Sequence, residues 1–290
     1  MRAPLHPPTR IAIGSHPGLT GADHTAQQVF NALQEYGMQP IICDSLYSDK
    51  LRNCIDHSEL DILIALGGDG TMLRAGRMCA PYQLPVMGIN LGHFGFLMEI
   101  DDKNWREALP RLAQGQYMIE DRMMIHGEHW RADVLQAEWE ALNDVVISRG
   151  SQVRPIRLVA EVDGYSLTNY VADGLIVATP TGSTAYALAV QGPVVSPELH
   201  NILIAPVAPH LSVDKTIIVS EKSKIRVEVH THHEAVLSPD GRGPMHLVDG
   251  DVIKVESSKY MASFVRLYDP GYFYHNLTRY LEHNPTAGAF

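Results

Sequence analysis

The chain has 290 residues, of which 45% are hydrophobic and 19% charged, and its formal net charge is −10. That length allows a large core or two domains, and the acidic balance excludes a general nucleic-acid-binding protein, whose surface would be basic. The longest apolar runs are too short to span a membrane, and the first residues lack the apolar core of a secretory signal. Three scattered cysteines do not form a disulfide framework, which favours a reducing compartment. We therefore expect a cytoplasmic protein that binds neither nucleic acid nor membranes.

The first part of the chain alternates strand and helix signals. Strands are indicated by apolar runs at residues 10–13, 41–42, 62–66 and 86–89. Continuous apolar runs are typical of strands buried on both faces of a parallel sheet. Apolar residues recur at helical spacing over 26–36, where Gly37 is suited to end the helix, and further helices are expected to begin at Thr71 and near Trp105. The pattern predicts an α/β domain with a mostly parallel sheet.

From about residue 117 the pattern changes to short, strand-like segments. Residues 225–229 alternate between apolar and charged side chains, which is the period of a half-buried strand. Asp163-Gly164 lies between two such segments, as in a hairpin turn, and Asp249-Gly250 is a weaker signal of the same kind. This part is therefore predicted to be β-rich and antiparallel.

These signals predict two domains. Residues 1–116 would form a Rossmann-like α/β domain, and residues 117–265 the β-rich domain. The tail, 266–290, carries apolar residues at the spacing of a short helix. We expect this helix to pack back onto the first domain and complete it.

A glycine-rich turn follows the third predicted strand. Its sequence, Gly67-Gly68-Asp69-Gly70-Thr71, places one carboxylate among three glycines. Glycine lets the backbone approach a phosphate closely, and the start of a helix favours anions. Because the carboxylate of Asp69 would repel a phosphate, we expect it to activate a hydroxyl beside the phosphate. The spacing matches neither the dinucleotide fingerprint nor the P-loop.

Residues 90–97, Asn-Leu-Gly-His-Phe-Gly-Phe-Leu, follow the fourth predicted strand. The carboxyl ends of parallel strands meet at one edge of a sheet, so this segment should lie beside the glycine turn. Its glycines could also do no more than shape a turn. Phe94 and Phe96 are interpreted equally well as anchors in the core.

Two further segments carry polar groups in the β-rich part. Asn143-Asp144 offers hydrogen-bond donors and acceptors, although alone it is typical of a turn. Residues 173–186 lead from an apolar run into a loop whose hydroxyls can bind a purine edge or a phosphate, those of Thr181, Ser183 and Thr184. Tyr186 offers a ring to pack on a base. A helix cap at Ser183 or Thr184 is compatible with binding.

Together the four segments resemble the NAD kinase family, in which they occur in the same order. The resemblance extends from Arg10 to about Tyr272. The glycine turn alone is shared with lipid kinases and phosphofructokinases, whereas the second and fourth segments are far more specific.

The resemblance implies an enzyme that transfers the terminal phosphoryl group of ATP, or of polyphosphate, to the 2′-hydroxyl of the adenosine ribose of NAD. It implies Mg²⁺ or another divalent cation on the donor phosphates, and no protein ligand for a metal is predicted. Members of the family form homodimers or homotetramers in which neighbouring subunits contribute substrate contacts.

By the same matching, Asp69 corresponds to the catalytic residue, which contacts the ribose and acts as general base. Asn143 and Asp144 would bind NAD, Asp173 would hold the nicotinamide amide, and Ala208 would lie near the nicotinamide. The matching implies substrate or cofactor contacts at Gly68, Gly70, Thr71, Arg74, Phe94, Asn143, Asp144, Arg154, Asp173, Ser183, Thr184, Ala185, Tyr186, Ala189 and Ala208.

Two features stand outside this matching. Asp240-Gly241-Arg242 replaces the Asp-Gly-Gln of many bacterial members, and Arg242 could contact phosphate or face solvent. Residues 230–233, His-Thr-His-His, fit no common zinc spacing. With His230 and His232 on one face, we interpret them as a solvated strand end.

Two other functions are compatible with part of the sequence. A lipid or sphingoid-base kinase would share the glycine turn, but it would leave residues 179–186 and Asn143-Asp144 unexplained. A module that senses NAD or NADP without turnover would keep the fold, but it would have no need of a base at Asp69. Both alternatives explain less of the sequence than an NAD kinase does.

Overall fold

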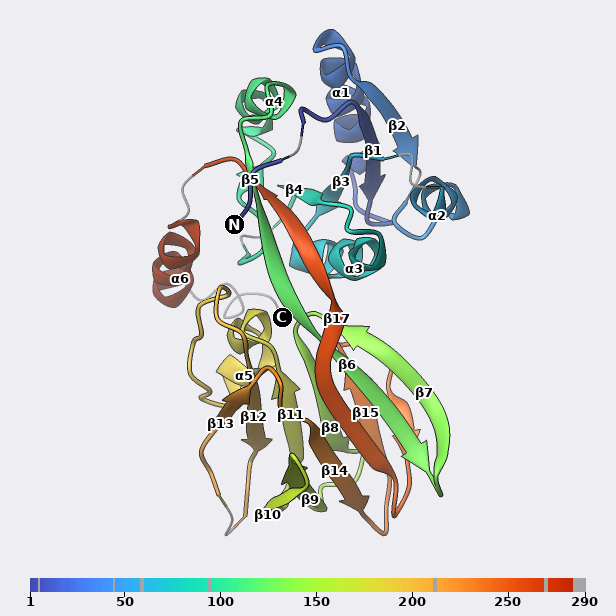
Figure 1. Ribbon diagram of the computed structural model, residues 1–290, viewed down its shortest axis with the longest axis vertical. Helices are drawn as coiled ribbons and strands as arrows, with labels where there is room; N and C mark the ends of the chain where they lie inside the picture. The colour runs from blue at the N-terminus through green and yellow to red at the C-terminus, as the bar shows by residue number, and fades with distance from the viewer. Residues whose placement is uncertain are drawn as a thin grey trace. The chain divides into compact units, whose positions relative to one another are not determined.

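The computed structural model describes residues 1–4, 6–43, 45–57, 60–92, 95–210, 213–268 and 271–283. Contacts divide the chain into two compact units (Figure 1). Unit 1 comprises residues 1–121 and 261–290, and unit 2 comprises residues 122–260. None of the helices in the described ranges has both the length and the apolar character needed to cross a membrane.

Unit 1 is built on a parallel sheet with the strand order β4-β3-β1-β2. Its strands are β1 (Arg10–Ser15), β2 (Gln39–Cys43), β3 (Ile62–Gly67) and β4 (Val86–Asn90), with the short β5 (Ile100–Asp101) paired to β4. Every residue of β3 and β4 is buried. The continuous apolar runs therefore mark central strands of a parallel sheet, as predicted.

The helices of unit 1 are α1 (Ala22–Glu35), α2 (Asp49–Asp56), α3 (Asp69–Cys79), the 3-10 turn η1 (Ala80–Tyr82), α4 (Trp105–Ala113) and α6 (Tyr272–His283). Helix α1 ends before Gly37, which has φ +76°, as expected of a glycine there. Helix α3 begins at Asp69 and not at Thr71, because Gly68 is its N-cap and the Thr71 hydroxyl accepts the Gly68 N–H at 3.4 Å.

The tail returns to unit 1, as predicted. The ring of Phe273 in α6 lies 6.5 Å from that of Phe96, and the Tyr272 hydroxyl donates to Glu120 at 2.9 Å. Both α6 residues are buried. The last strand and helix of the chain therefore complete the domain that the first residues begin.

Unit 2 is antiparallel, as predicted. One sheet has the order β13-β12-β11-β8-β15-β16, and β10, β9, β14 and β17 pair in a second sheet. The strands are β6 (Met118–Arg131), β7 (Val134–Ala141), β8 (Asp144–Arg149), β9 (Ile156–Val162), β10 (Tyr165–Ala172), β11 (Gly174–Ala178), β12 (Asn201–Val207), β13 (Ile217–Ser220), β14 (Ile225–His230), β15 (Ala235–Pro239), β16 (Met245–Leu247) and β17 (Val252–Arg266). Side chains of both sheets form one core, to which Ile147, Leu158, Val177 and Val227 contribute.

Two expectations for unit 2 need correction. Strands β6 and β17, with 14 and 15 residues, are longer than the short segments expected, because each runs from one unit into the other. Asp249-Gly250 forms a turn, but β16 pairs with β15 and β17 pairs with β14. The strands on either side of this turn therefore belong to different sheets and make no hairpin. Asp163-Gly164, in contrast, does join the paired strands β9 and β10.

His230, the last residue of β14, lies close to two carboxylates. His230 lies 3.2 Å from Glu228 and 3.6 Å from Asp249. The strand ends at His230, so His232 lies beyond it and is exposed. In the part of the chain that the structure describes, no three His, Cys, Asp or Glu residues are grouped to hold a metal ion.

Candidate functional site

Asp69 is the first residue of α3, and both of its carboxylate oxygens accept backbone N–H groups. Phe96 donates to Oδ2 at 2.7 Å, and Leu97 donates to Oδ1 at 3.1 Å. The side chain is partly exposed. The segment after β4 therefore lies beside the glycine turn, as predicted from the common edge of the sheet.

Gly95 makes this approach possible. A Cβ atom built there would lie 2.3 Å from the carboxyl carbon of Asp69, well inside any allowed contact. Phe96 is buried and packs on α6, which confirms its interpretation as a core anchor. The predicted contact residue Phe94 and its neighbour His93 lie outside the described residues.

A cavity of about 330 Å³ borders the glycine turn. Of the predicted residues, Gly68, Gly70, Thr71 and Arg74 line it. The guanidinium carbon of Arg74 lies 3.5 Å from the centre of the Tyr47 ring, a cation–π contact that fixes the side chain. Burial lowers the pKa of Arg74, yet an arginine remains charged at any physiological pH.

Besides Gly67 of the turn itself, four lining residues of this cavity were not predicted as contacts: His16, Leu19, Leu46 and Tyr47. They follow strands β1 and β2 at their carboxyl ends, the edge where ligands bind in parallel sheets. Applying that rule to β1 and β2, and not only to β3 and β4, would have identified them.

In unit 2, the turn that carries Asn143 and Asp144 is bound by a carboxylate from another strand. Asp240, just after β15, accepts the N–H groups of Leu142, Asn143 and Asp144 at 2.9, 2.7 and 3.1 Å. Its own N–H donates to the Asp144 carbonyl at 2.8 Å. Asp240 was given no role from sequence, and the structure shows that it fixes the backbone of this turn.

The opposite side of the turn is bound by the hydroxyl-rich loop. The Thr179 N–H donates to the Asn143 carbonyl at 2.8 Å, and the Thr179 hydroxyl donates to the Leu142 carbonyl at 2.5 Å. A Cβ atom on Gly182 would lie 2.0 Å from the Asn143 carbonyl oxygen. The third and fourth predicted segments therefore form one rigid surface.

The buried carboxyl of Asp144 is perturbed by its surroundings. Burial raises its pKa from 3.8 to about 7, the charge of Asp240 adds to the rise, and the Tyr186 N–H opposes it. Near neutral pH the Asp144 carboxyl is therefore partly protonated. In that form it donates one hydrogen bond as well as accepting others.

We expect Asp144→Asn to stabilise unit 2 at alkaline pH. A raised pKa in the folded state means that stability is fully present below pH 3.8 and is lost as pH rises through about 7. Asparagine escapes this loss, so at pH 8 the variant should gain about 2–4 kcal/mol in free energy of unfolding. Urea denaturation at pH 4 and pH 8 measures it, and an equal difference at both pH values would contradict it.

The remaining predicted residues of unit 2 fall into two groups. Ser183 is buried, and its hydroxyl donates to the Pro180 carbonyl at 2.6 Å and accepts the Val195 N–H at 3.0 Å, so it shapes the loop. The Thr184 hydroxyl donates to the Thr181 carbonyl at 3.2 Å. Side chains with exposed or partly exposed surface are those of Arg154, Asp173, Ala185, Tyr186, Ala189 and Ala208.

Two arginines of unit 2 contact this surface. Arg149 lies 3.0 Å from the Asp173 carboxylate, so the carboxylate already has a cationic partner. Arg242 is exposed, but its guanidinium donates to the carbonyls of Glu140 at 2.9 Å and Pro239 at 3.2 Å. Arg242 therefore braces the backbone beside Asp240.

Comparisons with known proteins agree with the motifs. Sequence models of the N-terminal and C-terminal domains of ATP-NAD kinase match residues 18–117 and 142–267. The NAD kinase of Moorella thermoacetica is 45% identical over 212 residues, which cover 73% of this chain and 68% of the relative. The chain belongs to the NAD kinase family. As a member it is a phosphotransferase. A second relative, the NAD kinase of Caldanaerobacter subterraneus subsp. tengcongensis, is 37% identical, and the match covers 85% of this chain and 90% of the relative.

Solved structures of NAD kinases share the fold. The yeast NADH kinase complexed with NADH superposes with a TM-score of 0.84 at 25% identity. The match covers 99% of this chain and 90% of the yeast chain. The NAD kinase from Archaeoglobus fulgidus in complex with ATP gives a TM-score of 0.74 at 27% identity, with 93% and 98% covered. The expected NAD kinase fold is thereby confirmed.

Proposed function

We propose that this NAD kinase transfers the terminal phosphoryl group of ATP, or of polyphosphate, to the 2′-hydroxyl of the adenosine ribose of NAD, with Asp69 as general base. The observation that carries the proposal is the geometry of Asp69. Its carboxylate is held by two N–H groups, the residue is partly exposed, and it stands between Gly68 and Gly70, which line the cavity although Asp69 itself does not. One homologous structure holds NADH and the other holds ATP, which supports a nicotinamide dinucleotide and ATP as substrates here.

The chemistry asked of Asp69 is the removal of one proton. Its carboxylate oxygens accept the Phe96 and Leu97 N–H groups. An ionised carboxylate can accept several hydrogen bonds at once, and we propose that a ribose hydroxyl donates to it when NAD is bound. As the proton moves to Asp69, the hydroxyl oxygen forms a bond to the terminal phosphorus, and the bond to the leaving phosphate breaks.

Charge on the donor phosphates would be met by the surroundings of the glycine turn. The start of helix α3 favours anions, and Arg74 supplies a fixed cation at the cavity wall. The turn that lines the cavity carries only one carboxylate, that of Asp69, which suits Mg²⁺ held mainly by the donor phosphates and water. When bound, the ion would neutralise charge that develops on the phosphoryl oxygens.

For the NAD side we propose the surface made by the Asn143-Asp144 turn and residues 179–186 of unit 2. The turn is bound on both sides, so its backbone is held in one conformation. Tyr186 is exposed and offers its ring to the adenine. Asp173 is partly exposed and offers its carboxylate to the nicotinamide amide. We further propose that the enzyme acts in the cytoplasm as a homodimer or homotetramer.

The test is incubation of the purified protein with NAD, Mg²⁺ and, in separate reactions, ATP and polyphosphate. We expect NADP to form with at least one donor, to be abolished by excess EDTA, and to return with added Mg²⁺. NADP formation with neither donor would overturn the proposal. Binding of NAD without turnover would favour the sensor, and phosphorylation of a sphingoid base would favour the lipid kinase.

A further inference from the structure

A buried ion pair in unit 1 is hydrogen-bonded to the segment that holds Asp69. Arg266, the last residue of β17, donates through Nε to Glu120 Oε2 at 2.7 Å, and its Nη2 lies 2.7 Å from the same oxygen. The exposed fractions of these residues are 4% and 3%. Neither side chain lines the cavity at the glycine turn.

The same guanidinium reaches the backbone beside the catalytic carboxylate. Arg266 Nη1 donates to the Leu97 carbonyl at 2.9 Å. The N–H of that residue donates in turn to Asp69 Oδ1 at 3.1 Å. A single residue, Leu97, therefore connects the cation to Asp69.

The C-terminal helix closes the same network. The Tyr272 hydroxyl donates to Glu120 Oε2 at 2.9 Å, and its ring centre lies 4.3 Å from the Arg266 guanidinium. The neighbouring Phe273 packs on Phe96, the second N–H donor to Asp69. Both donors to Asp69 are thus supported by the tail of the chain.

A contribution to the stability of the fold does not by itself explain why an ion pair is buried here. Replacing a buried ion pair by apolar side chains of similar volume is often neutral or stabilising. Arginine, however, presents a rigid fork that can bind a carboxylate and a carbonyl together. Catalysis needs such rigidity, because a misplacement of about 1 Å can cost about 10²-fold in rate.

We propose that Arg266, oriented by Glu120 and Tyr272, is a positioning residue that sets the orientation of Asp69 through the backbone of Leu97. This inference rests on the proposed role of Asp69 as general base. Arg266 itself touches no substrate. Its effect should therefore fall on kcat and depend on the presence of the Asp69 carboxylate.

Two variants test the proposal. Arg266→Met should lower kcat by about 10–100-fold and leave KM for NAD and for ATP within about threefold. Arg266→Lys keeps the charge beside Glu120, but one ammonium group cannot reproduce the fork. It should restore most of the thermal stability while kcat stays reduced. Recovery of kcat in step with stability would show a purely structural role and overturn the proposal.

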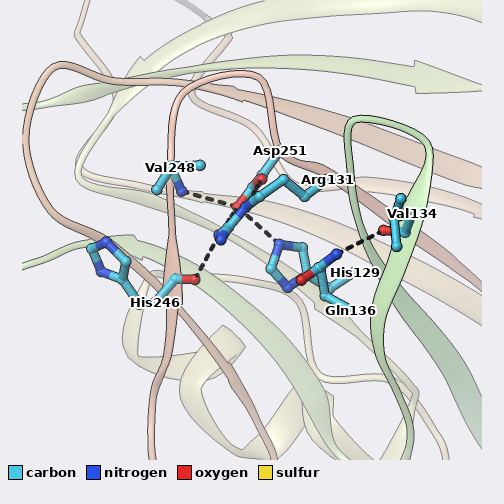
Figure 2. Close-up of polar contacts among 7 residues, drawn as sticks. All are labelled: His129, Arg131, Val134, Gln136, His246, Val248 and Asp251. Atoms are coloured by element: carbon cyan, nitrogen blue, oxygen red, sulfur yellow. Dashed lines mark hydrogen bonds and ion pairs between the residues drawn. The ribbon is translucent and has the colours of Figure 1, made fainter.

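Unit 2 provides a control with the same hydrogen-bonding pattern, the Arg131–Asp251 pair shown in Figure 2, in which the arginine side chain is 39% exposed where that of Arg266 is 3% exposed. Arg131 donates to the two oxygens of fully buried Asp251 at 2.8 and 2.9 Å, and to the His246 carbonyl at 3.4 Å. Arg131→Met therefore also removes an arginine bound to both a carboxylate and a backbone carbonyl. We expect it to lower Tm but to leave kcat unchanged well below Tm. A loss of kcat equal to that of Arg266→Met would count against the proposal.

A double-mutant cycle separates failure of this inference from failure of the proposed function. If Arg266 acts through Asp69, then Arg266→Met adds little further loss of kcat in the Asp69→Asn background. Fully additive losses would overturn the positioning role. If Asp69→Asn alone keeps wild-type activity, the general base itself is wrong, whatever the result at Arg266.

Discussion

Asp69→Asn should lower kcat by about 10²–10⁴-fold, while NAD still binds. Asparagine is similar in size to aspartate but cannot accept the ribose proton. It also offers one acceptor oxygen where the carboxylate uses two, so the Phe96 or Leu97 N–H loses its partner. Initial rates give kcat, and calorimetric titration gives the dissociation constant for NAD. Near wild-type kcat would refute the role of Asp69.

Gly95→Ala is an informative comparison with Asp69→Asn, because it leaves the Asp69 carboxylate chemically intact but forces it out of its position. The new methyl group would need the space of the Asp69 carboxyl carbon, 2.3 Å away. We expect a loss of kcat in the same direction as for Asp69→Asn. Gly243→Ala is a suitable control glycine, since a Cβ atom there meets nothing within 4 Å.

Gly182→Ala should weaken NAD binding by about 5–150-fold, the largest expected effect in unit 2. Its Cβ atom would lie 2.0 Å from the Asn143 carbonyl oxygen. That oxygen cannot yield easily, because it accepts the Thr179 N–H and the turn is held from the other side by Asp240. Forcing an extra carbon into a packed site typically costs about 1–3 kcal/mol, which here would separate the hydroxyl-rich loop from the turn.

The measurement for Gly182→Ala is the dissociation constant for NAD, with Tm recorded alongside. Gly243→Ala again serves as the matched control and should change neither quantity. Unaltered NAD affinity in Gly182→Ala would mean that the contact between the loop and the turn is not part of the binding surface. Loss of folding in this variant would show as a lowered Tm and would be distinguished from loss of binding.

The sequence was most informative for the parts of the site that are built from residues close together in the chain. The apolar run of β3 and the glycines after it predicted a buried parallel strand and a turn at a helix start. Parallel topology then predicted that residues 90–97 would meet that turn, and the Phe96 and Leu97 hydrogen bonds to Asp69 confirm it. These predictions needed only neighbouring residues and a general rule for sheets.

The unpredicted parts depend on partners that are distant in sequence. Asp240 binds the Asn143 turn across nearly a hundred residues, and Arg266 reaches Leu97 across an even longer separation. Nothing in the local pattern around either residue indicates its partner. The Asp249-Gly250 turn shows the same limit, because a turn signal reports that the chain reverses, but not which strand the next segment joins.

The division of unit 1 between the two ends of the chain has a consequence for biosynthesis. Unit 2 is one continuous segment, whereas unit 1 needs residues from 261 onward. A nascent chain emerges from the ribosome with its N-terminal part first, so the glycine turn is made long before Arg266 and helix α6. Products of premature termination would carry Asp69 without its support, and active enzyme would appear only after the last strand has been translated.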